Sequence, residues 1–506
     1  MKHNCPTLVD LFSDERDGGF LGAVETRQNC GFTCRRVYYI HGELEGKERG
    51  CHGHKRLEQF LVVLKGQVEI TLEGATGVHT FVIKDTSQGL YIPAGYWRVL
   101  DKMTNDTVVM VMASDPYDED DYLRDYDEFK LWLADQSKVS GVSYLNFDRM
   151  HYDLRFDLDC AHDAVMESCH YINGPHLSQF ENDFAKYCQG QYCVGVANGL
   201  QALEIILRGW GVTTGDEVIV AENSYIATVL AVSAVGAKPV LAKMDEKTFS
   251  IDASAIESMI TEKTKAIALT HLYGIPAQME KIVDIAKRHN IKVLEDSAQA
   301  HGATIEGQPV GSMGDAGAFS FYPTKNLGAY GDGGAIVTND SNLAEFARKY
   351  RDYGQSQKYK NDIIGTNSRL DELQAAFLTA KLKRLEGWNK KRRQLAEIYC
   401  RELADISGLC LPEFYENSQP VWHVFAVRVV NKKRDALQRH LHSKGVGTNI
   451  HYPIPVDQQE CYAELKGLYN TACSAKWGQE VLSLPLDPYH TEAEIEFVCK
   501  HVREFF

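Results

Sequence analysis

The chain has 506 residues, 44% of them hydrophobic, and a formal net charge of −15 at pH 7. This length exceeds one small core and predicts about three structural units in an ordinary globular protein. The acidic balance excludes general binding to nucleic acid or to anionic membranes, although it is compatible with a local basic pocket for an anionic ligand.

The sequence also bears on location and redox state. It shows neither a signal-peptide pattern nor an apolar stretch long enough to span a bilayer, so we expect a cytoplasmic protein without a membrane partner. Its 13 cysteines have no regular spacing and form no C-x-x-C pair. This pattern indicates reduced thiols rather than a disulfide framework or a zinc site.

Residues 1–136 are predicted to form an all-β unit. Short segments such as "RRVYYI", "FLVVLKGQVEITL" and "TFVIKD" alternate in polarity and are separated by glycine and charged turns. Helical periodicity begins only in the run at 120–135. The pattern favours a barrel or a jelly roll.

Near residue 140 an acidic, aromatic run gives way to small and polar residues, which predicts a linker at 137–145. Beyond it, from 146 to 506, β-like runs such as "DEVIVAE" and "KVLEDSAQ" alternate with helix-like runs such as "QMEKIVDIAKRHN". Such alternation predicts a parallel sheet with helices on both faces. We place a large α/β domain at about 146–400, which ends in a nearly continuous helix at 369–404, and a smaller α+β domain at 401–506.

Residues that can take part in binding or catalysis follow the β-like runs, where ligands of open parallel sheets bind. Asp296 ends one run, Asn198, Gly199 and Leu200 open a helix after another, and Lys325 follows a third. A helix N-terminus can hold a phosphate, and pyridoxal phosphate needs a lysine for its aldehyde and a carboxylate for its ring nitrogen. The alternatives for single residues are a helix cap, a simple turn and a solvated lysine.

Six motifs follow one another along this part of the chain: "GPHLSQFENDFAKY", "VGVANGLQALEI", "NSYIATVLAV", "LEDSAQAHGA", "SFYPTKNLGAYGDGG" and "NSRLDELQAA". In series they resemble the sugar aminotransferases of the DegT/DnrJ/EryC1/StrS family over roughly 145–506. The resemblance implies the type I aminotransferase fold, pyridoxal 5'-phosphate as cofactor and L-glutamate as amino donor. It also implies a homodimer or higher homo-oligomer whose cofactor sites are shared between subunits.

The same resemblance implies roles for individual residues. Lys325 would form the Schiff base, Asp296 would pair with the pyridine nitrogen, and Gln299 would lie near the ring hydroxyl. Some family members carry histidine in place of the lysine and dehydrate their substrate, so the lysine here favours amine transfer. The other expected site residues are Tyr225 on the ring, Gly199, Leu200 and Ser320 at the phosphate, Asn367 from the neighbouring subunit, and Tyr452 at the substrate.

The first unit carries a second candidate site in "RGCHGHKRLEQFLVVLKGQ". His52 and His54 are two apart on a strand and project to one face, and Glu58 completes the H-x-H-x-x-x-E metal motif of cupin barrels. In "GLYIPAGYWRVL", however, the position of the fourth cupin ligand is Arg98, and a guanidinium does not bind metal. We therefore expect no metal and favour the two histidines as acid and base, with histidines satisfied inside the core as the plain alternative.

The motifs "RRVYYI", "ERGCHGHKRLEQFLVVLKGQVEI", "GLYIPAGYWRVL" and "VMASDPYDEDDYLRDYDEF" resemble the sugar 3,4-ketoisomerases that act on dTDP-4-keto-6-deoxyglucose. This resemblance covers roughly 1–135 and implies a cupin jelly roll without metal in which His52 and His54 are the catalytic pair. An imidazole with a pKa of roughly 6.5 can move protons near neutral pH. The expected pocket residues are Arg49 at the diphosphate, with Arg36 as its competitor, Tyr38 at a sugar hydroxyl, Trp97 at the thymine face, and Arg98.

Together the two resemblances predict a bifunctional enzyme of dTDP-sugar metabolism. The first unit would turn a 4-keto-6-deoxy sugar into a 3-keto sugar, and the second would aminate C3 with glutamate. Three alternatives are kept: an epimerase-like unit feeding a C4 aminotransferase, a non-catalytic unit that only binds sugar nucleotide and docks the aminotransferase, and a cofactor-binding regulator without turnover.

Overall fold

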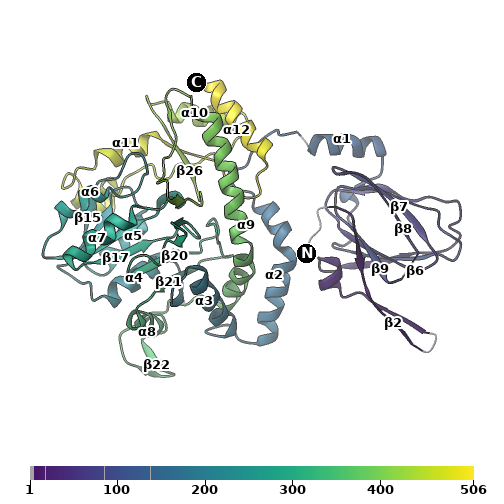
Figure 1. The fold of residues 1–506 in the computed structure, drawn as a ribbon, viewed down its shortest axis with the longest axis horizontal. Coiled ribbons are helices and arrows are strands. Elements are labelled where there is room, and N and C mark those ends of the chain that lie inside the picture. The colour runs from purple at the N-terminus through teal and green to yellow at the C-terminus, as the bar shows by residue number, and fades with distance from the viewer. Residues whose placement is uncertain (1–4, 17–18, 85, 137) are drawn as a thin grey trace. The chain divides into compact units, whose positions relative to one another are not determined.

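The computed structural model describes residues 5–16, 19–84, 86–136 and 138–506, which form two compact units (Figure 1). Unit 1 consists of Met1–Val139 with His151–Asp159, and unit 2 of Ser140–Met150 with Cys160–Phe506. Part of the expected linker therefore belongs to unit 2, where Val142 forms a parallel bridge with Val446. Residue 137 lies outside the described residues, and the domain limits that we expected stay a prediction.

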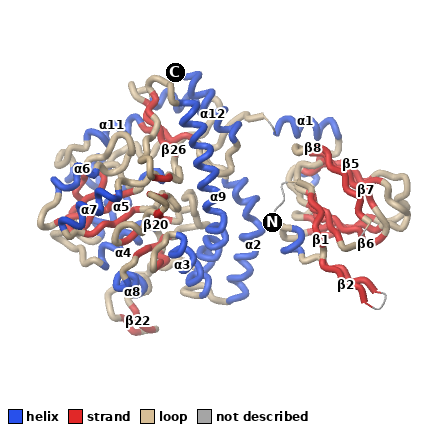
Figure 2. Tube along the Cα trace, in the orientation of Figure 1, coloured by secondary structure: helices blue, strands red, loops and turns tan. Residues whose placement is uncertain are grey.

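Unit 1 is built from two five-stranded antiparallel sheets, whose strands are red in Figure 2. The first sheet has the order β1 (Thr7–Asp10), β9 (Gln88–Ile92), β6 (Gln59–Lys65), β11 (Val108–Ala113), β4 (Arg36–Ile40). The second has the order β12 (Tyr122–Leu123), β5 (Arg49–His54), β10 (Trp97–Asp101), β7 (Val68–Gly74), β8 (Gly77–Ile83). A hairpin of β2 (Phe12–Arg16) and β3 (Gly19–Ala23) and the helix α1 (Tyr126–Gln136) complete the unit.

Alternation of side chains explains why these segments pair as sheets. In β7 every second residue is buried, and in β4 exposed residues alternate with partly buried ones. Successive side chains of a strand point to opposite faces, so one face of each sheet supplies the core. Leu61, Val63, Ile70, Leu72 and Leu90 lie there with less than 3% of their surface exposed. The all-β architecture predicted for residues 1–136 is confirmed.

Unit 2 contains a seven-stranded sheet in which β21 runs antiparallel to both of its neighbours and the other pairs are parallel. Its order is β13 (Tyr192–Val196), β21 (Gly334–Thr338), β20 (Ala316–Ser320), β17 (Lys292–Asp296), β16 (Thr264–Thr270), β14 (Glu217–Ala221), β15 (Lys238–Ala242). These strands read as continuous apolar runs because both faces of a parallel sheet are covered.

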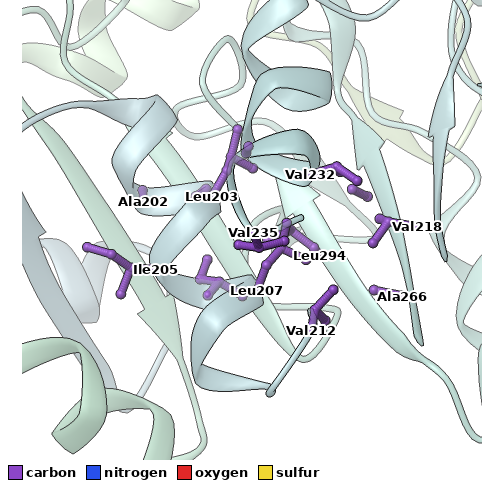
Figure 3. Close-up of a cluster of buried hydrophobic side chains, with 14 of the residues drawn as sticks. Ala202, Leu203, Ile205, Leu207, Val212, Val218, Val232, Val235, Ala266 and Leu294 are labelled. Atoms are coloured by element: carbon purple, nitrogen blue, oxygen red, sulfur yellow. The ribbon is translucent and has the colours of Figure 1, made fainter. Parts of the chain in front are cut away.

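Helices cover this sheet: α3 (Pro175–Tyr187), α4 (Gly199–Gly209), α5 (Ile226–Ala234), α6 (Ala253–Ile256), α7 (Met279–His289) and α8 (Ser341–Tyr350). Figure 3 shows the core beneath α4 and α5, where Leu203 and Leu207 from α4 meet Val218 from β14 and Leu294 from β17. Each of these residues exposes no more than 2% of its surface. The predicted helix-covered sheet of the large domain is confirmed.

The remaining elements of unit 2 are long helices and small sheets. The helix expected at 369–404 is α9 (Glu372–Leu403), the long green helix of Figure 1, which packs against α3 and α12. The helices are α2 (Phe147–Ser168, its residues His151–Asp159 counted with unit 1), α10 (Arg434–Ser443), α11 (Ala472–Glu480) and α12 (Glu492–Phe505). The sheets are β24 (Leu409–Cys410) with β26 (Phe425–Val429) and β27 (Val481–Leu484), β18 (Thr304–Ile305) with β19 (Gln308–Pro309) and β25 (Ser418–Gln419), and the hairpin β22 (Gln355–Gln357) with β23 (Lys360–Asn361).

Among the described residues, no helix combines the length and the apolar character needed to cross a membrane.

Candidate active sites

The candidate site of unit 2 gathers at the carboxyl ends of the parallel strands. Asp296 is the last residue of β17 and is 4% exposed, and Ser320 is the last residue of β20. Thr228 from α5 donates a hydrogen bond of 2.7 Å to the Asp296 carboxylate. The sequence reasoning did not single out Thr228, since its role depends on where the fold places α5 relative to the end of β17.

The loop after β20 carries Lys325 into this site. Burial lowers the pKa of the Lys325 amine to about 8, although the carboxylate of Asp296 acts to raise it. Three histidines beside the lysine, His301, His423 and His451, have pKa values well below the ordinary value because of burial and of the Lys325 charge. They are therefore neutral near pH 7, and Lys325 is the group there that releases a proton most readily near that pH.

The start of α4 forms a cradle next to Ser320. Asn198 caps the helix by accepting a hydrogen bond of 2.9 Å from the Gln201 N–H. The N–H groups of Gly199 and Leu200 lie in the first turn, where an α-helix offers no internal acceptor. A Cβ atom at position 199 would come within 2.7 Å of the Ser320 Cβ, so only glycine permits this close approach. The start of α4 and the Ser320 hydroxyl thus provide the hydrogen-bond donors that a phosphate requires.

Aromatic and amide side chains close the other side of the site. Tyr225 is the N-cap residue of α5 and is 48% exposed, and its ring centroid lies 4.9 Å from that of Tyr452. The Gln299 amide donates to the Tyr452 hydroxyl at 3.0 Å. The sequence predicted both Gln299 and Tyr452 as site residues, and the structure brings them into direct contact. Asn367 is exposed and pairs with Asp352, so its expected role in a neighbouring subunit stays a prediction.

These residues fit pyridoxal phosphate by their chemistry. A buried carboxylate at a strand end, an amine of lowered pKa and a helix N-terminus that approaches Ser320 at a glycine match the pyridine nitrogen, the aldehyde and the phosphate. When bound, the cofactor supplies a ring that accepts electrons from the reacting carbon.

The candidate site of unit 1 lies on the inner face of the second sheet. His52 and His54 stand on β5, with Arg98 of β10 opposite His52 and Tyr122 of β12 opposite His54. The two imidazole centroids are 4.9 Å apart, and the Tyr122 ring lies 4.2 Å from that of His54. Neighbouring strands thus place four polar groups together that the sequence separates by up to 70 positions.

The hydrogen bonds of the two histidines fix their orientation. Nδ1 of His52 lies 2.7 Å from the Gly50 carbonyl oxygen, and Nδ1 of His54 lies 2.9 Å from a carboxylate oxygen of Asp121. Both acceptors can only accept, so each Nδ1 carries the hydrogen. Both Nε2 atoms are buried and without a hydrogen-bond partner in the described part of the chain. They are free to accept a proton from a bound molecule.

The pKa values of the pair differ from our expectation of roughly 6.5. Burial, reinforced by the Arg98 charge, lowers the pKa of His52 to about 3. Burial lowers the pKa of His54 to about 4, while its hydrogen bond to Asp121 acts in the opposite direction. Both imidazoles are therefore neutral bases at neutral pH.

Arg98 is the charged group of this interior. Its side chain is 3% exposed and donates one hydrogen bond, to the Tyr96 carbonyl oxygen at 3.2 Å. Its Nε and Nη1 atoms are buried and have no partner among the residues described here. Burial lowers its pKa to about 10, which leaves it charged at neutral pH. A buried charge of this kind is costly unless a ligand pairs with it.

Glu58 does not join the histidines. It accepts a hydrogen bond of 2.7 Å from the Tyr152 hydroxyl and lines a small pocket with Ser114 and Arg155, and neither histidine belongs to that pocket. The next residue, Gln59, faces the interior instead and donates to the Tyr38 hydroxyl at 2.7 Å. The three ligands of the cupin metal motif are therefore not assembled.

Trp97 and the two candidate arginines lie in different surroundings. Trp97 is adjacent to Arg98 on β10, so it points to the opposite face, where it packs against Leu123 and Phe129 with 8% of its surface exposed. Arg36 lies over the Tyr38 ring at 5.4 Å, and Arg49 is exposed. The predicted contacts of Trp97 with a nucleobase and of Arg49 or Arg36 with the diphosphate stay predictions.

The fold and the lysine-centred site define the enzyme class of unit 2 as a pyridoxal-phosphate-dependent aminotransferase of fold type I. The chain belongs to the DegT/DnrJ/EryC1/StrS aminotransferase family, whose model matches residues 157–503. Residues 4–133 match a second, cupin-like family model, FdtA, described as WxcM-like, C-terminal. Both family resemblances stated from the motifs are confirmed at this level.

Curated relatives match about three quarters of the chain. The chain is 42% identical over 374 residues, 74% of its length, to the dTDP-3-amino-3,4,6-trideoxy-alpha-D-glucose transaminase of Streptomyces venezuelae, of which 98% is covered. It is 46% identical over 364 residues to the dTDP-3-amino-3,6-dideoxy-alpha-D-galactopyranose transaminase of Aneurinibacillus thermoaerophilus, covering 72% of this chain and 99% of the relative. Among solved structures, S. venezuelae DesV in complex with a ketimine intermediate superimposes with a TM-score of 0.70 at 43% identity, covering 72% of this chain and 99% of DesV.

Proposed function

We propose that the protein is a bifunctional enzyme of sugar nucleotides. Unit 1 isomerises dTDP-4-keto-6-deoxyglucose to a 3-keto-6-deoxy sugar, and unit 2 transfers an amino group from L-glutamate to C3. The product is a dTDP-3-amino-3,6-dideoxyhexose. The substrate class is supported by the two relatives, whose names place the amino group at C3 of a dTDP-sugar.

The observation that carries the isomerase is the pair of unpartnered Nε2 atoms on His52 and His54. Moving a ketone from C4 to C3 breaks the C3–H bond and forms a C4–H bond, while the O3 hydroxyl proton passes to O4. Two neutral, buried imidazoles with centroids 4.9 Å apart can accept and return these protons. No oxidant or reductant is required, because the oxidation of C3 balances the reduction of C4.

Arg98 provides the charge that the reaction needs. Removal of the C3 proton leaves a negative charge on the C4 oxygen, and a fixed cation in a dry site stabilises such charge strongly. The unpartnered Nε and Nη1 atoms of Arg98 are donors of the correct type. Tyr38 and Arg36 line the same interior and are suited to a sugar hydroxyl and the diphosphate. A metal is not part of the proposal, since Arg98 takes the position of a ligand.

In unit 2 most site residues bind the cofactor or the sugar, and one residue also carries a proton. Asp296, held by Thr228, keeps the pyridine nitrogen protonated, and Gly199, Leu200 and Ser320 bind the phosphate. Tyr225 covers the ring, Gln299 contacts the ring hydroxyl through its amide, and Tyr452 borders the sugar. The Lys325 amine binds the cofactor aldehyde and moves the proton at the reacting carbon, for which a pKa of about 8 is suitable. Asn367 reaches the cofactor of a neighbouring subunit in a homodimer.

The two activities form a sequence, since the 3-keto sugar made by unit 1 is a substrate type for unit 2. A ketose of this kind decays in water, and a second site on the same chain raises the local concentration of its substrate toward roughly millimolar. The proposal therefore explains why one chain carries both units.

The test is to incubate the purified protein with dTDP-4-keto-6-deoxyglucose and L-glutamate in D2O and to identify the product by NMR. We expect an amino group at C3 and deuterium at C4. An amino group at C4 would replace the proposal with a C4 aminotransferase and an epimerase-like unit 1. Amination of a supplied 3-keto sugar, without any deuterium exchange of the 4-keto substrate, would reduce unit 1 to a sugar-binding module.

A further inference from the structure

The two histidines of unit 1 are not equivalent, because only His54 is backed by a carboxylate. Asp121, the last residue of the short helix Glu119–Asp121 before β12, is 5% exposed. One of its oxygens lies 2.9 Å from Nδ1 of His54 and the other accepts the Arg56 N–H at 2.7 Å. The Leu57 N–H also donates to the carboxylate at 3.3 Å. The carboxylate is thus locked in one orientation by the backbone.

This orientation has a chemical consequence for His54. Burial acts to raise the pKa of Asp121, but the His54 hydrogen bond and the Arg56 and Leu57 N–H groups outweigh it, so the pKa lies below the ordinary value. A carboxylate has no hydrogen to give, so Nδ1 of His54 must carry the proton and Nε2 must be the lone pair. The Gly50 carbonyl gives His52 the same tautomer but no negative charge.

The charged and titratable groups that face His54 come from every strand around it. They are Asp121, Arg98 of β10, Arg36 of β4, His52 of β5 and Tyr122 of β12. Two of these neighbours are cations, which oppose a proton on His54, and Asp121 is the anion that favours it. Without Asp121 an imidazolium at position 54 would face only cations and neutral rings among these neighbours.

We propose that Asp121 is the positioning residue of the isomerase, which holds His54 as an Nε2 base and stabilises its imidazolium after it has taken the carbon-bound proton. This inference rests on the proposed isomerisation. In the step concerned, the C3–H bond breaks, the proton forms a bond to Nε2 of His54, and the electron pair moves onto the C4 oxygen. The O3 hydroxyl proton passes to the C4 oxygen, and His54, after its proton has exchanged with water, delivers a proton to C4, so no co-reactant is needed.

The test compares Asp121→Asn with Asp118→Asn in the full chain. In Asp121→Asn the amide can face His54 with its NH2 group, which favours the tautomer in which Nε2 carries the hydrogen and is no base. General base catalysis of this kind is worth about 10²- to 10⁴-fold, and we expect deuterium exchange at C3 to slow by that factor. Asp118 lies on the same turn and pairs with the exposed Arg56 side chain, so its variant should exchange at the wild-type rate.

A pH profile separates positioning from a structural effect. The residual exchange of Asp121→Asn should keep its rate to lower pH than wild type, because loss of the anion lowers the pKa of His54. Amination of a supplied 3-keto sugar by unit 2 should be unchanged and reports that the chain is folded. If Asp121→Asn exchanges deuterium at C3 at the wild-type rate and with an unshifted pH profile, the inference is overturned. If the wild-type protein shows no exchange, the proposed isomerase is overturned instead.

A measurement on the wild-type protein covers the case in which Asp121→Asn fails to fold. With ¹⁵N-labelled histidine, the signals of residue 54, assigned by their loss in His54→Gln, should show a protonated Nδ1 and an unprotonated Nε2 at pH 7. The opposite tautomer would contradict a role of Asp121 in holding the base.

Discussion

The two candidate sites differ in how their polar atoms are satisfied. In unit 1 the Nε2 atoms of His52 and His54 and two nitrogens of Arg98 are buried without hydrogen-bond partners among the described residues. In unit 2 Thr228 donates to the Asp296 carboxylate and the Gln299 amide donates to the Tyr452 hydroxyl, although both ring nitrogens of His301 beside Lys325 have no such partner either. Each buried polar group left unpaired costs on the order of 1–3 kcal/mol. The unpaired proton acceptors and cation of unit 1 therefore lower its stability. In unit 2, hydrogen bonds already hold the Asp296 and Gln299 side chains in position for a cofactor.

The largest expected effect tests whether amination by unit 2 and isomerisation by unit 1 are independent activities. Lys325→Ala removes the amine that binds the cofactor aldehyde, and amination should fall by more than about 10³-fold. Isomerisation should stay at the wild-type rate, since His52 and His54 are untouched. The measurement is NMR of the products, and loss of both activities would show that the sites are not separable.

A labelling experiment provides the control for that variant. Borohydride treatment of the protein with pyridoxal phosphate should attach the cofactor to Lys325 only. Lys381 is the matched lysine, because burial lowers its pKa to about 8 as well, but its Nζ donates to the Gly328 carbonyl oxygen at 2.7 Å. A label on Lys381 would mean that a low pKa, and not position, selects the lysine.

The reverse variant tests the acid–base pair of unit 1. His52→Asn removes a titrating group while nearly keeping its shape, and we expect isomerisation to slow by about 10²- to 10⁴-fold. The variant should still aminate a 3-keto sugar made by the Lys325 variant, so that mixing the two restores the amino sugar. His79→Asn, on β8 of the same sheet, is the control that should keep full activity. Normal amination of the 4-keto substrate by His52→Asn would favour the C4 aminotransferase.

The guanidinium of Arg98, of which two nitrogens have no partner among the described residues, allows the sites to be compared by stability as well as by rate. Arg98→Met keeps the length of the side chain and removes the charge, so enediolate stabilisation is lost and the rate should fall by about 10²- to 10³-fold. At the same time the free energy of unfolding of unit 1 should rise by about 1–3 kcal/mol, since an unpaired buried donor is gone. Chemical denaturation measures this, with Arg35→Met at an exposed position as control. A destabilised Arg98→Met would show that the guanidinium is satisfied.

The pKa of Lys325 predicts a smaller effect, a shift of a pH midpoint in a stated direction. A lysine with a pKa of about 8 becomes a free amine as pH rises through 8, whereas an ordinary lysine does so near 10.4. When pyridoxal phosphate and borohydride are added to the apoprotein, the rate of labelling of Lys325 should therefore rise with pH, with a midpoint near pH 8. Asp296→Asn removes the anion that favours the ammonium form, so its midpoint should lie lower. A midpoint above that of wild type would contradict the position of Asp296 beside the amine.

The smallest expected effect concerns metal. Because Glu58 bonds to Tyr152 and Arg98 takes a ligand position, protein treated with a chelator should isomerise at the wild-type rate. Activity lost on chelation and restored by zinc, iron or manganese would show that His52 and His54 are ligands.

Residues that are close in the chain could be grouped from the sequence. The H-x-H pair lies on one strand, Asp296 and Ser320 end their strands, and Lys325 lies in the loop after β20, so motif and element predict the same groups. The alternation of a strand could also have been applied to Trp97, since Arg98 faces the interior and its neighbour on the strand faces the other way. The same alternation places Gln59, and not Glu58, inside.

Other residues were beyond reach because pairing across the fold positions them. Asp121 reaches His54 only because β12 pairs with β5, and one acidic run contains several carboxylates that the sequence cannot rank. Thr228 of α5 reaches Asp296, 68 positions further along the chain, only in the folded structure. The pKa values of His52 and His54 depend on burial and on Arg98, neither of which is a property of the motif.

The position of β13 at the edge of the large sheet has a consequence for biosynthesis. Its one neighbour in the sheet is β21, so the strand ending at Val196 cannot be completed until Thr338 has left the ribosome. At a synthesis rate of about 5–20 residues per second, the intervening chain takes roughly 7–30 s to emerge. During this interval β13 lacks its partner strand, and α4, which packs against β20 and β21 as well as α5, lacks part of its final contacts. Apolar surface of unit 2 therefore stays uncovered on the nascent chain, whereas all strands of unit 1 have been synthesised before β13.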